Sequence, residues 1–256
     1  MNYFSSKIAA KRYSKGRPDF HSNTIRHIKN YLHLDKKLNK ALDIACGTGL
    51  STRALLEIAT NVYGTDTSQA MLDVAAQSDK IQYALAPAEQ QPFGDDAFDL
   101  ITVSSGVHWF DIDKFLIEAN RLLKSRCWLV LYENYFIAEM VGNADFTHWF
   151  ADVYLKQFPS PPRNNNYVWT NENLILKGFN FVGEVRFKNA ITFTKEQLAL
   201  YFTTQSNIIA AVVKRLTTYE QVENWLDQEL TAFFDDAGST RTINYGNWIK
   251  YIQRAT

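Results

Sequence analysis

The chain has 256 residues, 46% of them hydrophobic, and its 27 lysines and arginines balance its 27 aspartates and glutamates. This length suffices for one large α/β domain with an added cap or for two small domains, and the zero net charge disfavours nucleic acid as a partner. Two cysteines, Cys46 and Cys127, are too few for a disulfide framework and lack the spacing of a zinc site, so we expect a cytoplasmic protein without a metal.

The N-terminal segment is predicted to be helical. Residues 1–40 are polar, and Ile25, Ile28 and Leu32 recur at roughly helical intervals. Charges run through the first residues, and no stretch of about 18 apolar residues occurs anywhere, so we expect neither a signal peptide nor a membrane span. This helical segment is expected to cover the glycine-rich motif that follows it.

The stretch from about 40 to 133 alternates between short apolar runs and helical patterns. The apolar runs are ALDIA, NVYGT, IQYALA, FDLITVSS and WLVLYE, and the helical patterns between them include STRALLEIA, SQAMLDVAAQS and DKFLIEANRLLK. Strands separated by helices of about three turns predict right-handed β-α-β units and a parallel sheet covered on both faces. The apolar stripe of the helix between Asp113 and Lys124 is expected to pack on this sheet.

The pattern changes at residue 134. An aromatic-rich helix around ADFTHWFADVYLKQF precedes PSPPRNNNY, whose prolines and asparagines predict a surface loop that closes a cap insertion. A strand is expected at FVGEVRFKNAITF, helices from about 195 to 235, and a last strand or strand pair at TINYGNWIKYIQRA. Aromatic residues form 14% of the chain and are expected either to fill a core or to line a pocket for an organic substrate.

The strongest chemical signal is an apolar strand that ends in a glycine-rich turn, ALDIACGTGLS (41–51). Glycines let the backbone approach a ligand closely, and the helix that follows offers unpaired N–H donors. Thr52 stands where the dinucleotide fingerprint has its third glycine, and the lysine of a phosphate-binding loop is missing. Both differences disfavour NAD and ATP as ligands.

This turn resembles that of the class I S-adenosylmethionine-dependent methyltransferases, where it cradles the methionine part of S-adenosylmethionine. Asp43, Gly47 and Gly49 match the family pattern, so the resemblance implies that they bind this cofactor. It also implies an α/β fold with a Rossmann-like, seven-stranded, mostly parallel sheet and helices on both faces. A helical cap would come from the N-terminus and from insertions in the C-terminal half.

A second match is VYGTDTSQAML (62–72), in which Asp66 ends a strand. A carboxylate at this place can accept hydrogen bonds from both ribose hydroxyls, whereas the alternative is an acid that faces only water. Met71, one turn into the next helix, resembles the apolar residue that lies against the adenine ring in this family. A methionine on a helix is otherwise a core residue.

A third match is APAEQQPF (86–93), which resembles the xDAExLPF block of the family. In relatives the loop after the third strand binds adenine through a backbone N–H, which here is that of Ala88. Pro87 stands where many relatives carry an acid that can bond the adenine amino group. Glu89 is therefore the remaining candidate for that contact.

A fourth match is TVSSGVHWFD (102–111), which follows the fourth strand, where the family presents groups such as Ser104 to the methyl donor and acceptor. The HWFD segment, together with Tyr13-x-x-x-Arg17-Pro18, resembles the trans-aconitate methyltransferase-like branch of the Methyltransf_11 family. The resemblance spans most of the chain, being densest from 41 to 133 and loose beyond 134.

The implied organisation is a single methyltransferase domain over residues 1–256. Residues 1–40 are expected to form a helical cover, 41–133 the cofactor-binding core, and 134–256 the cap insertions and the terminal strands. Acceptor choice is expected to reside in the cap, because variable surface segments carry specificity on a rigid scaffold.

The expected chemistry is an in-line transfer of a methyl group from a sulfonium. His108 is a candidate general base for a phenol, alcohol or protonated amine, whereas for a carboxylate it would only orient the acceptor or be purely structural. The rings of Tyr13 and Trp109 can face the sulfonium as aromatic rings face ammonium groups, or they form a packed wall. Arg17 is expected to pair with the cofactor carboxylate or an acidic substrate, the alternative being a surface arginine.

These features predict S-adenosylmethionine-dependent methyl transfer to a small-molecule acceptor, and the branch resemblance suggests a carboxylate or hydroxyl oxygen. The alternative is a protein that binds S-adenosylmethionine without turnover, as a sensor or partner subunit, and the replaced acid at Pro87 is its support. A dehydrogenase is a third hypothesis, which the missing glycine opposes. We expect a monomer or homodimer whose partner is a small molecule, not nucleic acid or a membrane.

Overall fold

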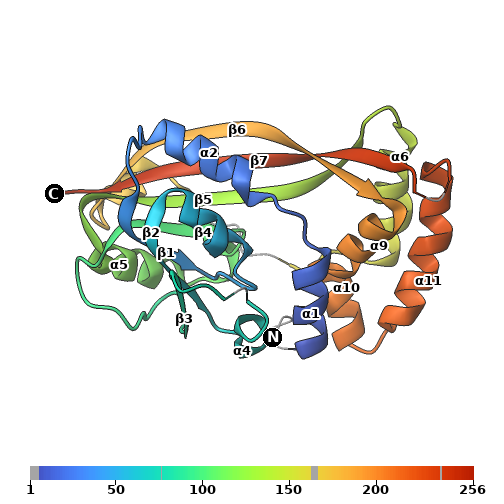
Figure 1. Ribbon diagram of the computed structural model, residues 1–256, viewed down its shortest axis with the longest axis horizontal. Helices are drawn as coiled ribbons and strands as arrows, with labels where there is room; N and C mark the ends of the chain where they lie inside the picture. Colours follow the sequence, from blue (N-terminus) through green and yellow to red (C-terminus); the bar gives the residue numbers. More distant parts are fainter. Residues whose placement is uncertain (1–5, 76, 163–166, 237) are drawn as a thin grey trace. The chain divides into compact units, whose positions relative to one another are not determined.

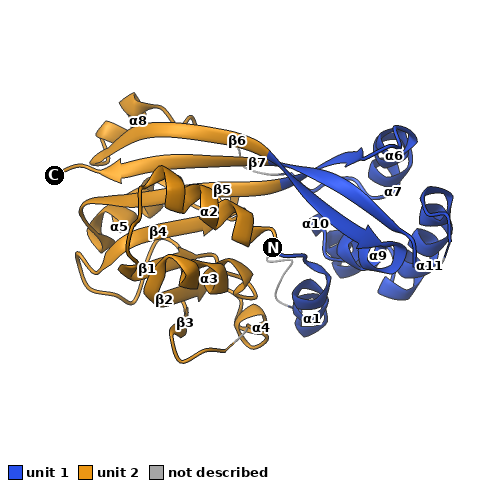
Figure 2. Cartoon of the chain, turned by 45° about the horizontal axis from the view of Figure 1, so that its top comes forward, with its two compact units in different colours: residues 1–19, 135–162, 188–246 blue, residues 20–134, 163–187, 247–256 orange. Residues whose placement is uncertain are grey.

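A computed structural model describes residues 6–75, 77–162, 167–236 and 238–256. The chain, coloured along its sequence in Figure 1, folds into two compact units that Figure 2 colours separately. Unit 1 consists of residues 1–19, 135–162 and 188–246, and unit 2 consists of residues 20–134, 163–187 and 247–256. The single domain expected over 1–256 stays a prediction.

Within the described residues, seven strands form one sheet in the order β3-β2-β1-β4-β5-β7-β6. The strands are β1 (Leu38–Ile44), β2 (Ala59–Asp66), β3 (Ile81–Leu85), β4 (Phe98–Ser104), β5 (Leu123–Met140), β6 (Phe179–Thr194) and β7 (Thr240–Arg254). The pairings from β3 across to β5 are parallel. Because β5 and β6 run from unit 2 into unit 1 and β7 runs back, β7 is antiparallel to its neighbours. The predicted α/β fold with a seven-stranded, mostly parallel sheet is confirmed.

Helices cover both faces of the sheet in unit 2. Its helical segments are α2 (His21–Tyr31), α3 (Leu50–Ala54), η1 (Leu55–Glu57), α4 (Gln69–Leu72), η2 (Val107–Trp109), α5 (Ile112–Leu122) and α8 (Asn171–Ile175). Leu42 and Ile101 pack with α5 and α8 on one face, whereas Ala41 and Leu100 pack with α2 and the α3–η1 segment on the other. Successive strand residues point to opposite faces, so one short strand contributes to both layers of the core.

Helix α4 of unit 2 is shorter than predicted. The pattern predicted about three turns at SQAMLDVAAQS, but α4 spans only Gln69–Leu72. After Leu72 the backbone N–H groups of Val74 and Ala75 bond to carbonyls three residues back, as in a tight turn. This turn also buries Ala75, so the burial pattern resembles that of a longer helix.

Unit 1 has a core of packed aromatic rings. Its helical segments are α1 (Lys7–Gly16), α6 (Asp145–Trp149), the π-helical η3 (Phe150–Tyr154), α7 (Leu155–Gln157), α9 (Lys195–Thr203), α10 (Ser206–Val213), α11 (Tyr219–Leu230) and η4 (Thr231–Phe233). Phe146, Trp149 and Tyr154 of the predicted aromatic helix are buried, and so are Tyr201 and Phe202 of α9. These rings fill a core, which is one of the two interpretations of the aromatic excess.

The predicted change of pattern at residue 134 is wrong by several residues. Strand β5 continues through it to Met140, and the predicted helices from about 195 to 235 are α9, α10 and α11. The predicted final strand is the single strand β7, and part of the predicted loop, residues 163–166, lies outside the described residues. Among the helices of the described residues, none combines the length and the apolar character needed to cross a membrane.

Candidate active site

The glycine-rich turn between β1 and α3 has three residues in the left-handed region, Ala45, Gly47 and Gly49, with φ of 57°, 54° and 74°. A Cβ on Gly49 would lie 2.2 Å from the Tyr83 hydroxyl, whereas a Cβ on Gly47 would meet only the Met71 methyl carbon at 4.0 Å. A glycine is thus required at position 49 both by its φ and by the nearby Tyr83 side chain. Gly47 is the glycine with open space beside it.

Asp43 holds this turn from inside the protein. It is completely buried on β1, and its Oδ2 accepts hydrogen bonds from the hydroxyls of Ser51 at 2.6 Å and Thr52 at 2.7 Å. Its Oδ1 accepts a bond from the Thr102 hydroxyl of β4 at 3.1 Å. Burial raises the pKa of Asp43 to about 6, although the three hydroxyls oppose this shift. Its contact with a cofactor stays a prediction.

Asp66 links the end of β2 to the same turn. Its Oδ2 accepts the Gly47 N–H at 2.9 Å, and its Oδ1 accepts the Ser68 N–H at 2.8 Å. Burial raises the pKa of this carboxyl. A carboxylate has about four lone-pair sites, so Asp66 can accept a further donor beside these backbone N–H groups.

Met71 lies beside Gly47 because Ser68 caps α4. The Ser68 hydroxyl accepts the Met71 N–H at 3.3 Å, and Met71 is only 4% exposed. The structure therefore brings Gly47, Asp66 and Met71 together, three of the predicted cofactor-binding residues. We call them the Gly47 group.

The loop after β3 starts beside the end of β2, where the Ala86 N–H donates to the Asp66 carbonyl at 3.0 Å. Ala88 is buried, and among the described residues none accepts a hydrogen bond from its N–H. Glu89 Oε1 accepts the Asp111 N–H at 2.8 Å, just before α5. Glu89 is therefore used to hold the start of a helix, and its predicted contact with adenine stays a prediction.

The segment after β4 packs on the glycine-rich turn. A Cβ on Gly106 would lie 2.7 Å from the Cβ of Ala45. Ser104 ends β4 and is half-buried, while His108 and Trp109 form η2, with their ring centroids 4.8 Å apart. Trp109 is 48% exposed, so its ring is accessible to a ligand.

Tyr13 and Arg17 belong to unit 1. The guanidinium carbon of Arg17 lies 4.7 Å from the centroid of the Tyr13 ring and 5.0 Å from that of Tyr201. Its Nη2 donates to the Thr204 carbonyl at 3.0 Å. Its Nε is buried without a hydrogen-bond partner, and among the described residues no carboxylate forms an ion pair with it. Arg17 is therefore a cation held against aromatic rings, not a freely solvated surface arginine.

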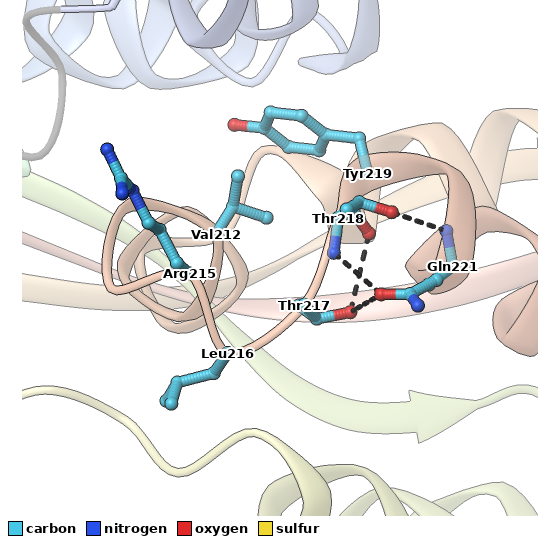
Figure 3. A pocket seen from close by; sticks show the side chains of 7 residues that line it. All are labelled: Val212, Arg215, Leu216, Thr217, Thr218, Tyr219 and Gln221. Atoms are coloured by element: carbon cyan, nitrogen blue, oxygen red, sulfur yellow. Dashed lines mark hydrogen bonds between the residues drawn. The ribbon is translucent and has the colours of Figure 1, made fainter.

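A surface pocket of unit 1 contains none of the predicted site residues. Thr217 and the backbone N–H of Thr218 donate to the Gln221 side chain at the start of α11, so these polar groups already serve a helix cap (Figure 3). The lining residues are Val212, Arg215, Leu216, Thr217, Thr218, Tyr219 and Gln221. Across the part of the chain that the structure describes, no group of His, Cys, Asp or Glu side chains is arranged to hold a metal.

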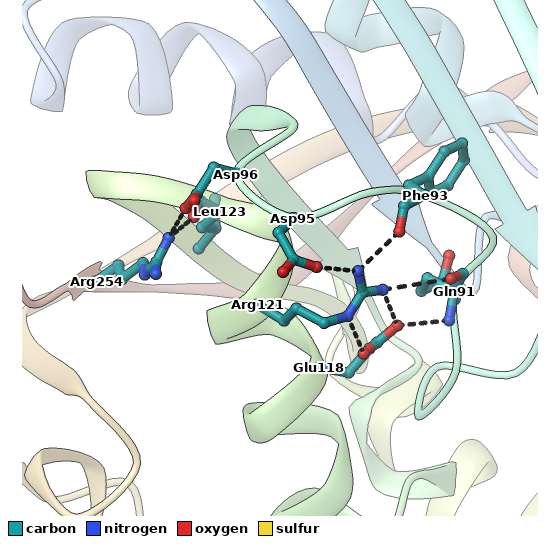
Figure 4. A network of polar contacts seen from close by, with 8 residues as sticks. All are labelled: Gln91, Phe93, Asp95, Asp96, Glu118, Arg121, Leu123 and Arg254. Carbon is teal, nitrogen blue, oxygen red and sulfur yellow. Dashed lines mark hydrogen bonds and ion pairs between the residues drawn. The ribbon is translucent and has the colours of Figure 1, made fainter.

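Sequence reasoning missed three residues that contribute to this region. Tyr83 of β3 packs against Gly49 and shares a hydrogen bond with the Thr52 hydroxyl. Arg121 and Glu118 of α5 bind the loop that follows Glu89 (Figure 4). The only sequence signal for Arg121 and Glu118 is their spacing of three on a helix, which is typical of ordinary surface ion pairs.

Comparisons with known proteins agree with this geometry. Residues 42–131 match the family described as a methyltransferase domain. A protein of Dictyostelium discoideum, named as a methyltransferase, is 31% identical over 136 residues, which cover 53% of this chain and 51% of that protein. The chain thus spans about half the length of this curated relative.

Two solved structures share the fold. A type II methyltransferase from Anaeromyxobacter dehalogenans superposes with a TM-score of 0.70 at 19% identity, covering 93% of this chain and 97% of that one. Phosphoethanolamine N-methyltransferase 2 of Haemonchus contortus, in complex with S-adenosyl-L-methionine, gives a TM-score of 0.53 at 18% identity, covering 98% of this chain and 57% of that one.

Proposed function

We propose that this chain is a class I, S-adenosylmethionine-dependent methyltransferase, which the match of residues 42–131 to a methyltransferase domain supports, and that it transfers a methyl group from this cofactor to a small-molecule acceptor. The observation that carries the proposal is the Gly47 group, in which an open glycine, a carboxylate and a buried methionine lie together. It offers backbone, ribose-binding and apolar surfaces side by side, as a nucleoside ligand needs.

The residues present fit the cofactor. Gly47 leaves space for the methionine part, Asp66 can accept the two ribose hydroxyls, and Met71 offers an apolar surface to the adenine ring. The Ala88 N–H has no acceptor among the described residues and can donate to the ring. When bound, S-adenosylmethionine supplies an electrophilic methyl group on a positively charged sulfur.

The role of the protein in such a transfer is to hold the acceptor in line with the methyl group and to exclude water. We assign the acceptor side to His108 and Trp109, which follow β4. His108 can take the proton of a hydroxyl or ammonium acceptor, while for a carboxylate it only orients the oxygen. Trp109 offers an aromatic face to the cationic centre, and the same role for Tyr13, which belongs to unit 1, stays a prediction.

Arg17 supports an acceptor or cofactor group that carries a carboxylate. Its guanidinium faces two tyrosine rings and has no acidic partner among the described residues. A guanidinium that already packs against aromatic rings loses little further hydration on pairing, and its two-pronged geometry matches a carboxylate. Carboxylate or hydroxyl O-methylation of the kind implied by the trans-aconitate branch is therefore part of the proposal.

We also propose that the methyl acceptor is a small organic molecule and not nucleic acid or a membrane surface. The chain has no net charge that would gather polyanions. The named acceptor of the Haemonchus contortus neighbour, phosphoethanolamine, is a small molecule. We propose a cytoplasmic monomer or homodimer.

Calorimetric titration with S-adenosylhomocysteine tests the cofactor site. The wild-type protein is expected to bind it, and Asp66→Ala is expected to bind at least tenfold more weakly, since both ribose hydroxyls lose their acceptor. NAD is the negative control. Failure of well-folded wild-type protein to bind S-adenosylhomocysteine would refute the proposal.

Turnover distinguishes the enzyme from a protein that binds the cofactor without using it. Radiolabelled methyl transfer is measured with a panel of small carboxylic acids, phenols and amines. We expect transfer to at least one class, and Arg17→Met is expected to abolish it if the acceptor is an acid. Binding without transfer to any of them would favour the sensor alternative, which Pro87 in place of an acid supports.

A further inference from the structure

A polar network on α5 holds the loop that follows Ala88. Arg121 Nη1 donates to the Phe93 carbonyl at 2.8 Å and to Asp95 Oδ1 at 2.7 Å, and its Nη2 donates to the Gln91 carbonyl at 3.4 Å (Figure 4). Glu118, three residues earlier on α5, binds the same guanidinium at 2.7 and 2.9 Å. Arg121 thus fixes three points of the loop 91–95 to one helix.

Gln91 extends this network to the residue before Ala88. The Gln91 N–H donates to Glu118 Oε1 at 2.7 Å, and its side-chain Nε2 donates to the Pro87 carbonyl at 2.7 Å. A continuous path of hydrogen bonds therefore runs from Arg121 through Glu118 and Gln91 to the peptide that carries the Ala88 N–H. Pro87 lacks an N–H of its own, so its carbonyl is the polar backbone group by which this residue can be held.

The Gln91 side chain is present at an energetic cost. It is only 5% exposed, and its Oε1 is buried with no hydrogen-bond partner. A buried acceptor without a partner is unfavourable, and an apolar side chain of similar size would avoid that cost. What the amide contributes in return is the bond from its Nε2 to the Pro87 carbonyl.

We propose that Arg121 and Glu118 are positioning residues, which act through Gln91 to aim the Ala88 N–H at the adenine ring and so set the preference for adenine over hypoxanthine. The inference rests on the proposed cofactor site. Adenine N1 is an acceptor that suits an N–H donor, whereas N1 of hypoxanthine carries a hydrogen. A firmly held N–H donates a hydrogen bond to N1 of adenine. It cannot do so to N1 of hypoxanthine, because two donors would then face each other.

The test compares the affinity for S-adenosylhomocysteine with that for its hypoxanthine counterpart, S-inosylhomocysteine. Calorimetry is carried out on the wild-type protein, Arg121→Met, Arg121→Lys and Glu118→Gln. Arg254→Met is the matched control, because Arg254 binds Asp96 and the Leu123 carbonyl at the far end of the same connection (Figure 4). Thermal unfolding establishes that each variant is folded.

The expected result is a wild-type preference for the adenine ligand of at least tenfold, retained in Arg254→Met and reduced by at least threefold in Arg121→Met and Glu118→Gln. A purely structural role would weaken both ligands equally and leave the ratio unchanged. An unchanged ratio in folded Arg121→Met and Glu118→Gln overturns the inference, and Arg121→Lys takes the place of Arg121→Met if the latter does not fold. Absence of binding by the wild-type protein refutes the proposed function itself.

Discussion

At the scale of single residues, a buried carboxylate shows how the protein uses polar groups to shape a backbone turn. Asp43 gathers hydroxyls from Ser51 and Thr52 after the turn and from Thr102 on the neighbouring strand. The glycine-rich turn is therefore fixed by a side chain beneath it, while Tyr83 packs against it from β3. A turn held by its own side chains has little freedom to lose when a ligand binds, which favours affinity.

The replacement Asp43→Asn is expected to change how stability depends on pH. Burial raises the pKa of Asp43 from 3.8 to about 6, so the folded state holds its proton more tightly than the unfolded state. Wild-type stability should therefore fall, relative to the variant, as pH rises from about 4 to about 6, by about 3 kcal/mol. Urea denaturation of both proteins at several pH values measures this difference. Parallel curves would contradict the assignment.

At the scale of elements, side chains at helix starts decide where the chain turns in unit 1. Thr194 and Gln197 form a reciprocal capping box at the start of α9, and Thr218 and Gln221 form another at the start of α11. Each box satisfies backbone N–H groups that the first helical turn leaves without partners. The first box begins the helical stretch expected from about 195 to 235 and the second separates α11 from α10, whereas the start of α10 has no side-chain cap.

Removal of one box should destabilise unit 1 by a predictable amount. The Thr194 hydroxyl accepts the Gln197 N–H at 3.3 Å, and Gln197 Oε1 accepts the Thr194 N–H at 2.9 Å. Thr194→Ala is expected to lower the free energy of unfolding by about 1 kcal/mol, whereas Thr194→Ser should be nearly neutral because serine also caps helices well. Chemical denaturation monitored by circular dichroism measures both. Equal losses in the two variants would show that the hydroxyl is not the cause.

At the scale of the whole molecule, the order of segments along the chain differs from their grouping in space. Unit 1 is assembled from three separate stretches, and the strands β5, β6 and β7 each contribute residues to both units. The Gly47 group, the Ala88 loop and η2 all belong to unit 2, whereas Tyr13 and Arg17 belong to unit 1. The predicted site residues are thus drawn from both units.

Binding of S-adenosylhomocysteine should stabilise the folded chain through linkage. At a ligand concentration of 100 times Kd, the free energy of unfolding is expected to rise by about 2.7 kcal/mol. Differential scanning fluorimetry measures the shift in Tm, and hydrogen exchange locates it. Exchange should slow around residues 45–49, 66–71 and 86–89, and at the same ligand concentration the Asp66→Ala control should show both effects reduced. Protection confined to other segments would contradict the placement of the site.

Local periodicity and short motifs were enough to predict the alternation of strands and helices, the glycine-rich turn and the acid at the end of β2. The sequence did not reveal that Gly49 faces Tyr83, that Glu89 bonds to Asp111, or that Arg121 holds the loop after Ala88. It also predicted a helix of about three turns where α4 spans only Gln69–Leu72. These contacts join residues far apart in the chain or depend on how a turn closes, and periodicity carries no information about either. They form when folding of the sheet brings the ends of its strands together, so they can be identified from the folded chain alone.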